Sequence, residues 1–349
     1  MRKTILIRAD GSKSIGMGHL SRCCLIGNHF KKELNIDFIL FTRRDILVER
    51  FLSNKSDRII WIDSNISLKE ELNTIENISK QENASLFILD DLEKDLNDKY
   101  MQSINLMRFA VLVITDDSFR RVIDANIVLN GNPNQQEFSY QNEKAEYLIG
   151  PQYFLMDSIY SSKSLPLYKN NPKKILITFG GSDHNNLIFK TLQSLEMHSS
   201  FFDKMEFLII VSNTSAYLEK LQKHLENTTL KYELLCNVPS LAPYWEQCDL
   251  SLTAGGNTLF ERIAANVPGA TLCQLERQNE IANCFEFLGV NANLGLGPKV
   301  TIKVLGYKII KFIKNKKLHE AMHRTSPNVI DGKGLERMTE VLIKKEYIL

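Results

Sequence analysis

The chain has 349 residues, of which 44% are hydrophobic and 24% charged, and its formal net charge is +2. This length suits two globular domains that each have their own core. The small net charge argues against a nucleic-acid or membrane-surface partner, and no apolar run approaches the ~18 residues of a membrane helix, so we expect no membrane insertion.

The first half of the chain alternates apolar runs with helix-like stretches, which is typical of a parallel sheet. The runs that predict buried strands are Ile5–Ile7, Phe38–Phe41, Ile59–Ile62, Leu86–Leu89, Val111–Ile114 and Ile127–Leu129. The stretches that predict helices are Leu20–Leu34, Leu68–Gln81 and Leu96–Met107. We therefore expect an N-terminal Rossmann-like domain over residues 1–155, followed by a polar linker that contains two prolines and ends at Pro172.

The second half repeats this alternation and predicts a second Rossmann-like domain over residues 173–349. Its expected strands are Ile175–Phe179, Phe207–Val211, Leu230–Leu235, Leu250–Thr253 and Ala270–Cys273. The predicted fold class is therefore α/β, with two doubly wound domains. Ligands of open α/β sheets bind at the carboxyl ends of the strands, so two such domains are expected to face each other across a cleft.

A glycine loop with a histidine follows the first predicted strand, in the order Gly16-Met17-Gly18-His19. The glycines permit a sharp turn, and His19 stands at the start of the next helix, where a neutral imidazole could serve as a general base. Arg22 lies one turn further on the same face and could bind a carboxylate or a phosphate. The alternative is that His19 only caps the helix and packs.

Two more glycine loops follow predicted strands in the second half, Gly180-Gly181-Ser182-Asp183 and Gly255-Gly256-Asn257-Thr258. A strand, small residues and then a helix place free backbone N–H groups at a helix N-terminus, where phosphates bind. Two such loops suggest a diphosphate. Glu261 comes one turn after the second loop and could accept hydrogen bonds from ribose hydroxyls. The alternative for Glu261 is a solvated helix acid.

These motifs together resemble the UDP-sugar hydrolases of pseudaminic acid biosynthesis and the related spore-coat polysaccharide proteins, which share the two-domain glycosyltransferase B (GT-B) fold. The resemblance rests on motifs in family order from residue 5 to about 297. The matching segments are Arg8-Ala9-Asp10, Ile15-Gly16-Met17-Gly18-His19, Arg22-Cys23, Ile114-Thr115-Asp116-Asp117, Leu148-Ile149-Gly150-Pro151-Gln152-Tyr153, Ile177-Thr178-Phe179-Gly180-Gly181-Ser182-Asp183, Ala254-Gly255-Gly256-Asn257-Thr258 with Glu261, and Gln278 with Ile281-Ala282.

The resemblance implies a hydrolase that releases UDP from a UDP-amino-sugar in nonulosonic acid or surface polysaccharide biosynthesis. His19 would deprotonate the water that attacks the anomeric carbon. The residues implied to contact the substrate are Asp10, Gly18, Arg22, Asp90 and Gln278. The residues implied to bind UDP are Gly180, Gly181, Ser182, Gly255, Gly256, Asn257, Thr258 and Glu261, with the backbone near Val238 meeting the uracil. The family resembles a metal-independent system, so no metal or other cofactor is expected.

The sequence departs from the family pattern at two places. Asp90-Asp91-Leu92 stands where these hydrolases commonly have Asp-His-Tyr, and Arg277 replaces the asparagine before Gln278. The sugar could therefore differ from that of the pseudaminic acid pathway. A GT-B glycosyltransferase, with His19 activating an acceptor hydroxyl, is the alternative that the departure at Asp91-Leu92 favours. A non-catalytic nucleotide-sugar-binding protein is a third class, but it would need neither His19 nor Arg22 in a glycine loop.

The six cysteines form no metal-ligand spacing and lie mostly in apolar stretches, so we expect reduced core cysteines in a cytoplasmic protein. A strand that begins by residue 3 or 4 leaves no room for a signal peptide. The expected protein is a monomer whose partner is its UDP-sugar substrate.

Overall fold

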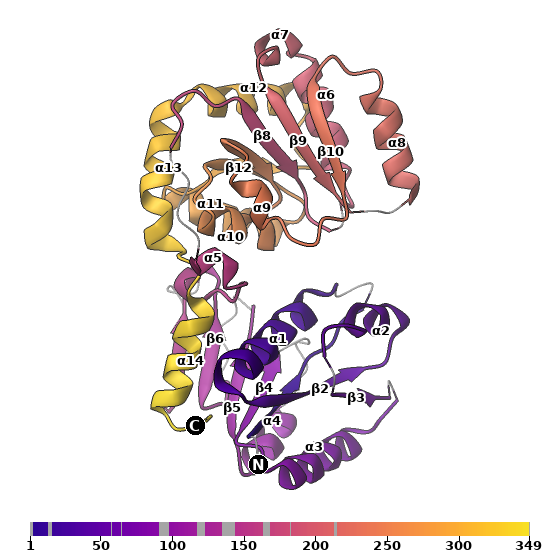
Figure 1. Ribbon diagram of the computed structural model, residues 1–349, viewed down its shortest axis with the longest axis vertical. Coiled ribbons are helices and arrows are strands. Elements are labelled where there is room, and N and C mark those ends of the chain that lie inside the picture. The colour runs from indigo at the N-terminus through magenta and orange to yellow at the C-terminus, as the bar shows by residue number, and fades with distance from the viewer. Residues whose placement is uncertain are drawn as a thin grey trace. The chain divides into compact units, whose positions relative to one another are not determined.

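The computed structural model describes residues 3–12, 16–56, 58–63, 65–90, 98–116, 123–134, 144–162, 168–181, 183–212 and 215–348. The chain divides into two compact units. Unit 1 is Met1–Asp157 together with Lys333–Leu349, and unit 2 is Ser158–Gly332. Each unit is a parallel sheet with helices packed on it (Figure 1), which confirms the predicted α/β class. No described helix is both long and apolar enough to span a bilayer.

Unit 1 contains a seven-stranded sheet in the order β3-β2-β1-β4-β5-β6-β7, and every pair of neighbours is parallel. Its strands are β1 (Thr4–Arg8), β2 (Asp37–Arg43), β3 (Ile59–Ile62), β4 (Leu86–Asp90), β5 (Ala110–Ile114), β6 (Ile127–Asn130) and β7 (Glu146–Ile149). Its helices are α1 (Gly18–His29), α2 (Ile46–Leu52), α3 (Leu68–Glu82), α4 (Asp98–Asn105) and α14 (Gly334–Lys344). The central strands are buried from end to end, as parallel strands covered on both faces must be.

The C-terminal helix α14 belongs to unit 1, so the expected second domain of residues 173–349 extends too far. The apolar face of α14 carries Leu335, Met338 and Leu342, which lie in the same core cluster as Leu20 of α1. Arg337 also donates a hydrogen bond from Nη1 to the Gln152 carbonyl at 2.9 Å. The sequence shows an amphipathic helix here, but an apolar stripe does not say which of two sheets it will cover.

Unit 2 contains a six-stranded parallel sheet in the order β10-β9-β8-β11-β12-β13. Its strands are β8 (Lys174–Thr178), β9 (Glu206–Val211), β10 (Lys231–Cys236), β11 (Leu250–Thr253), β12 (Gly269–Cys273) and β13 (Ala292–Leu296). Its helices are α5 (Ile159–Ser162), α6 (Leu187–Glu196), α7 (Ser199–Phe202), α8 (Ser215–Leu225), α9 (Ala242–Trp245), α10 (Asn257–Ala264), α11 (Glu276–Phe287), α12 (Ile302–Lys314) and α13 (Lys316–Val329).

Two strands have no counterpart among the expected strands, and both lie at an edge of a sheet. β7 has only one fully buried residue, Leu148, and β13 likewise buries only Leu294. An edge strand pairs on one side only and does not need a continuous apolar run. Its sequence therefore lacks the signal by which the central strands are found.

The strand order reverses direction at the same place in both sheets. In unit 1 the reversal falls between β1 and β4, and in unit 2 it falls between β8 and β11. Connections leave neighbouring strands toward opposite faces at such a point, which opens a crevice at their carboxyl ends where ligands of open α/β sheets bind. The segments after β1, β4, β8 and β11 are therefore the first place to look for functional side chains.

Candidate active site

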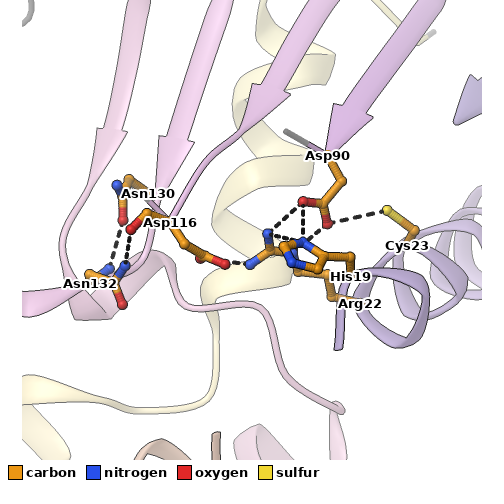
Figure 2. Close-up of polar contacts among 7 residues, drawn as sticks. All are labelled: His19, Arg22, Cys23, Asp90, Asp116, Asn130 and Asn132. Atoms are coloured by element: carbon orange, nitrogen blue, oxygen red, sulfur yellow. Dashed lines mark hydrogen bonds and ion pairs between the residues drawn. The ribbon is translucent and has the colours of Figure 1, made fainter. Parts of the chain in front are cut away.

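In unit 1 the crevice between β1 and β4 holds His19 and Asp90. The chain leaves β1, forms a two-way backbone bridge between Ser12 and Gly16, and enters α1 at Gly18. Gly16 has a φ of +83°, a conformation that favours glycine. This turn places His19 on the first turn of α1, opposite the end of β4 where Asp90 stands (Figure 2).

His19 and Asp90 form a close pair. The Nδ1 atom of His19 lies 2.8 Å from Oδ1 of Asp90, whose side chain is 0% exposed, while the imidazole is 21% exposed. Because an ionised carboxylate only accepts hydrogen bonds, Nδ1 must carry the proton in this contact. In the neutral imidazole the other ring nitrogen, Nε2, is then an acceptor. A carboxylate that fixes the tautomer of a histidine in this way is the arrangement of a general base.

Arg22 holds the Asp90 carboxylate from a second side. Its Nε atom lies 2.5 Å from Oδ2 of Asp90 and its Nη2 atom 2.5 Å from Oδ1, which makes a bidentate pair. Its Nη1 atom donates to Oδ1 of Asp116 at 2.8 Å. Arg22 is expected from the sequence to bind a carboxylate or a phosphate; the structure shows it bound to two carboxylates of the chain itself. The positive charge of Arg22 is therefore already paired with carboxylates of the protein itself.

The pKa of Asp90 is set by these neighbours. Burial alone would raise it, but the charge and hydrogen bonds of Arg22, with the hydrogen bond from His19, lower the pKa to about 2. Burial and the nearby Asp90 charge raise the pKa of the Cys23 thiol, which donates to Oδ2 of Asp90 at 3.6 Å. Asp90 is therefore a carboxylate at neutral pH, and Cys23 is a protonated thiol.

A row of polar groups continues from Asp90 along the carboxyl edge of the sheet. Asp116 follows β5, and its carbonyl accepts a hydrogen bond from Nδ2 of Asn132 at 3.2 Å. The backbone N–H of Asn132 donates to Oδ1 of Asn130, at the end of β6, at 3.1 Å. Figure 2 shows these residues in strand order from Asp90 to Asn132. Asp116, Asn130 and Asn132 are not among the expected site residues, although Asp116 lies within a family motif and polar residues after strands were the available signal.

Asp10 also follows β1 but turns to a different set of partners. Its carboxylate pairs with the Arg8 guanidinium at 2.6 and 2.8 Å and accepts the backbone N–H of Arg43 at 2.7 Å. The Nε atom of Arg8 also donates a hydrogen bond to Oε1 of Glu71, on α3, at 2.8 Å. The Asp10 side chain is 8% exposed. The resemblance implies a substrate contact for Asp10; in the structure its carboxylate takes part in an internal network that ties β1 to β2 and α3.

In unit 2 the glycine loop after β11 leads directly into α10. Gly256 is the residue before the helix, and no side chain caps it. Within the part of the chain that the structure describes, the N–H groups of Gly255, Gly256, Asn257 and Thr258 meet no acceptor. A helix N-terminus carries roughly half a positive charge, and these N–H groups add directed donors. This is the geometry of an anion site.

Gln278 lies against this loop. A side chain at Gly255 would come within 2.9 Å of both Cβ and the carbonyl oxygen of Gln278, so the position is restricted to glycine by close packing. Oε1 of Gln278 accepts the backbone N–H of Gln274 at 2.9 Å. The amide nitrogen of Gln278 is therefore on the side of Gly256. The structure therefore places Gln278, an expected substrate contact, beside the loop at Gly255–Thr258.

The other glycine loop of unit 2 differs from this one. Helix α6 begins at Leu187, six residues after Gly181, so the glycines do not lie at its N-terminus. The carboxylate of Asp183 accepts the N–H groups of Leu187 at 2.7 Å and Ile188 at 2.9 Å. The expectation of a free helix N-terminus after Gly180-Gly181 is therefore wrong, because an acid of the chain occupies it. The expected UDP contact Ser182 lies outside the described residues.

Asp183 also accepts hydrogen bonds from Nε2 of Gln274 at 2.6 Å and from the Tyr217 hydroxyl at 2.8 Å. Gln274 therefore contacts the 180–186 loop through its side chain and Gln278 through its backbone. A Cβ atom at Gly180 would lie 3.9 Å from Oγ1 of Thr258. The two glycine loops are therefore neighbours within unit 2, joined through Gln274.

Glu261 lies on α10, one turn after the anion site. Its Oε2 atom accepts a hydrogen bond from the Tyr160 hydroxyl of α5 at 3.2 Å. Val238 is half-buried just after β10, whose strand is two places from β8, or about 10 Å along the sheet. Among the described residues, no group of three or more His, Cys, Asp and Glu side chains could hold a metal ion. Asp91 and Leu92 lie outside the described residues.

No family model matches the chain. The chain is 26% identical to the spore coat polysaccharide biosynthesis protein SpsG of Bacillus subtilis over 357 aligned positions, which cover 96% of each protein. The chain is therefore similar to SpsG over nearly its whole length. Its fold is GT-B. MurG of Acinetobacter baumannii aligns with a TM-score of 0.73 and 15% identity, covering 98% of this chain and 99% of MurG. A putative UDP-N-acetylglucosamine 2-epimerase from Listeria monocytogenes aligns with a TM-score of 0.67 and 13% identity, covering 99% and 97%.

Proposed function

We propose that the chain is an enzyme that processes a UDP-linked sugar in polysaccharide biosynthesis, and that it releases UDP by hydrolysis. Support comes from the SpsG relative, whose name refers to polysaccharide biosynthesis, and from a structural neighbour named for a UDP-sugar reaction. The observation that carries the proposal is the contact at 2.8 Å between Nδ1 of His19 and buried Asp90. It leaves Nε2 as a proton acceptor.

In the proposed reaction, Nε2 of His19 takes a proton from water as the water oxygen bonds to the anomeric carbon. The bond between that carbon and the β-phosphate oxygen breaks, and UDP leaves with the electron pair. The imidazolium that forms is hydrogen-bonded to Asp90, which is ionised at neutral pH. His19 then returns its proton to solvent. The resemblance implies that Asp90 and Arg22 contact the substrate; in this proposal they position the imidazole instead, because Asp90 is fully buried and Arg22 is paired with two carboxylates.

Unit 2 would hold the nucleotide. The uncapped N-terminus of α10 and the loop Gly255–Thr258 supply N–H donors for the diphosphate, and their dipoles are oriented before the charge on UDP develops. Gln278 would add its amide nitrogen, and Glu261 would accept hydrogen bonds from the ribose. The loop at Gly180-Gly181 would contact phosphate only through its own backbone N–H groups. The N-terminus of α6 is not available, because the Asp183 carboxylate already accepts its N–H groups. Val238 would lie at the uracil.

The second candidate is a glycosyltransferase, which the Asp91-Leu92 departure in the sequence favours. The same histidine can deprotonate an acceptor hydroxyl in place of water. Incubation with a panel of UDP-sugars, with and without sugar acceptors, separates the two candidates. Free sugar and UDP without an acceptor support the hydrolase. UDP release only with an acceptor selects the transferase. No turnover of any UDP-sugar, in a preparation that binds UDP, argues against both enzymes.

A further inference from the structure

The charge of the chain is unevenly distributed near its C-terminus. Its net charge is only +2, yet the stretch from Phe287 to His319 contains no Asp, Glu or Arg. The same stretch contains seven lysines: Lys299, Lys303, Lys308, Lys311, Lys314, Lys316 and Lys317. An average over the whole chain hides this local excess, so the net charge does not exclude an anionic partner for this part of unit 2.

The structure places most of these lysines on one helix face. Helix α12 buries Leu305, Ile309 and Phe312 in the core of unit 2. Its exposed positions repeat at helical spacing: Lys303, Val304, Tyr307, Lys308, Lys311 and Lys314. Together with Lys316 and Lys317, which begin the next helix, α13, they form what we term the lysine face. Positions three and four apart lie on the same side of a helix. The part of the lysine face on α12 is therefore one continuous strip.

Several of these lysine ammonium groups make no polar contact with the part of the protein that the structure describes. Among the described residues, Lys303, Lys311 and Lys317 have no hydrogen-bond or ion-pair partner. The other lysines of the face have neutral partners: Lys308 donates to the Leu294 carbonyl at 2.7 Å, Lys316 donates to Oδ1 of Asn171 at 2.7 Å, and Nζ of Lys314 lies 5.1 Å from the Phe201 ring centroid. Lys299, which lies outside the face, pairs with Glu276 at 3.5 Å. Helix α12 itself contains no carboxylate that could neutralise its lysines.

Two apolar side chains stand within this strip. Val304 is 45% exposed and Tyr307 is 56% exposed. Aromatic residues such as tyrosine are enriched at the interface between a bilayer and water, and clusters of four to eight lysines on an amphipathic helix bind anionic lipid headgroups. Nucleic-acid sites favour arginine, whose planar group pairs with phosphates and bases, but the stretch has none. The mixture of lysine, valine and tyrosine fits a lipid surface better.

We propose that the lysine face of α12 is a docking surface for an anionic membrane, on which the protein binds reversibly without inserting. The apolar side of α12 is committed to the core of unit 2, so the contact is electrostatic and shallow. Figure 1 shows α12 at the end of unit 2 where β8 and β9 begin, whereas the glycine loops follow the carboxyl ends of the strands. A membrane on this face leaves the anion site of α10 open. This inference is independent of the proposed function.

The test is co-sedimentation of the full chain with vesicles of phosphatidylcholine, with and without phosphatidylglycerol, at low ionic strength. We expect binding only to the anionic vesicles, and loss of binding at 0.5 M salt. The triple variant Lys303→Gln, Lys311→Gln, Lys317→Gln should partition about a hundredfold less, since each lysine near an anionic surface contributes about a tenfold or smaller factor. Tyr307→Ser should lower vesicle binding severalfold.

The matched control is the triple variant Lys204→Gln, Lys220→Gln, Lys223→Gln. It removes the same charge from exposed positions of the same unit and should bind as the unaltered chain does. Acids stand near these lysines in the sequence: Asp203 beside Lys204, and Glu219 and Glu226 around Lys220 and Lys223. Three outcomes overturn the proposal: no binding of the unaltered chain to anionic vesicles, equal losses in both triple variants, or preferential binding of a DNA duplex that Tyr307→Ser leaves unchanged. Thermal melting of each variant verifies that it is folded.

Discussion

In unit 1 the segments at the strand-order reversal carry ionisable side chains, whereas in unit 2 the corresponding segments present mainly backbone groups. The segments after β1 and β4 carry His19, Arg22 and Asp90, joined by contacts of 2.5 to 3.1 Å. The segments after β8 and β11 carry glycine loops, and the helix N-terminus of α10 is uncapped. Both crevices arise at the reversal of the same strand order. The fold determines where a site can lie, and the sequence of the loops determines which chemical groups are present there.

This contrast predicts which changes each unit tolerates. A charge network is sensitive to the loss of a single ionised partner, because the remaining charge is left buried. A binding loop that uses backbone N–H groups has no side-chain charge to lose. It is sensitive instead to added side-chain volume where the packing is closest. Changes in unit 1 should therefore alter rate and acid stability, and changes in unit 2 should alter affinity for UDP.

The largest expected effect is that of His19→Ala. Loss of a general base typically costs about 10²–10⁴-fold in rate, and the nucleotide contacts of unit 2 are unchanged. Turnover of the UDP-sugar should therefore fall by that factor while the UDP dissociation constant, measured by calorimetry, stays the same. His29→Ala removes the other histidine of α1, in its last turn, and should retain activity. A His19→Ala enzyme with normal turnover would exclude His19 as the base.

Asp90→Asn should lower stability in a manner that depends on pH. The pKa of Asp90 falls from an ordinary value of 3.8 to about 2 on folding, so its carboxylate stabilises the fold above pH 3.8, and this contribution is lost as the pH falls through about 2. At pH 7 the variant should lose about 2 kcal/mol of unfolding free energy. Urea denaturation between pH 7 and pH 2.5 should show the difference between the two proteins shrinking with acid.

Asp116→Asn provides the matched comparison for Asp90→Asn. Asp116 contacts the same Arg22 guanidinium, but its side chain is 32% exposed, compared with 0% for Asp90. Solvent screens the more exposed pair, so the loss at pH 7 should be smaller. A stability difference for Asp90→Asn that does not change between pH 7 and pH 2.5 would mean that the buried carboxylate does not gain its stability from Arg22 and His19.

Gly255→Ala should weaken UDP binding, whereas Gly181→Ala should not. A Cβ at Gly255 would lie 2.9 Å from the Gln278 backbone, while a Cβ at Gly181 would meet only Oγ of Ser212 at 3.8 Å. Forced overpacking typically costs about 1–3 kcal/mol, which corresponds to about a tenfold to hundredfold loss of affinity if the loop shifts. Calorimetric titration of both variants with UDP measures the difference. Equal affinities would place the nucleotide away from the α10 loop.

The sequence predicts the fold class and most of the strands because buried parallel strands are continuous apolar runs. It also places His19, Asp90 and the α10 loop after strands, where a site is expected. It does not reveal which charges pair. Arg22 and Asp116 are 94 residues apart, and only the order of strands brings β5 near α1. Nor does it show that Asp183 caps α6, since an acid after two glycines fits either an open or a closed helix end.

Glu261→Gln should weaken UDP binding without affecting the chemical step. The proposed contacts are hydrogen bonds from ribose hydroxyls to a carboxylate, each worth about 1.5–3 kcal/mol before reorganisation, and an amide accepts them less strongly. Affinity should fall about tenfold, with kcat at saturating substrate nearly unchanged. A parallel titration with uracil alone serves as the control, since it lacks the ribose. An unchanged UDP affinity would make Glu261 a structural acid of α10.

The smallest expected effect is that of Tyr160→Phe, which tests whether Glu261 is held in place for the ribose. The Tyr160 hydroxyl donates to Oε2 of Glu261 at 3.2 Å, and its side chain is buried, so the substitution removes one hydrogen bond and keeps the packing of the ring. A hydrogen bond of this kind contributes about 0.5–1.5 kcal/mol, so UDP affinity should fall by roughly twofold to tenfold. In the Glu261→Gln background the same change should have less effect, because the carboxylate that Tyr160 orients is already absent. Additive losses in the double variant would show that Tyr160 supports α10 independently of Glu261, and that unit 2 does not rely on a positioned side chain at the ribose.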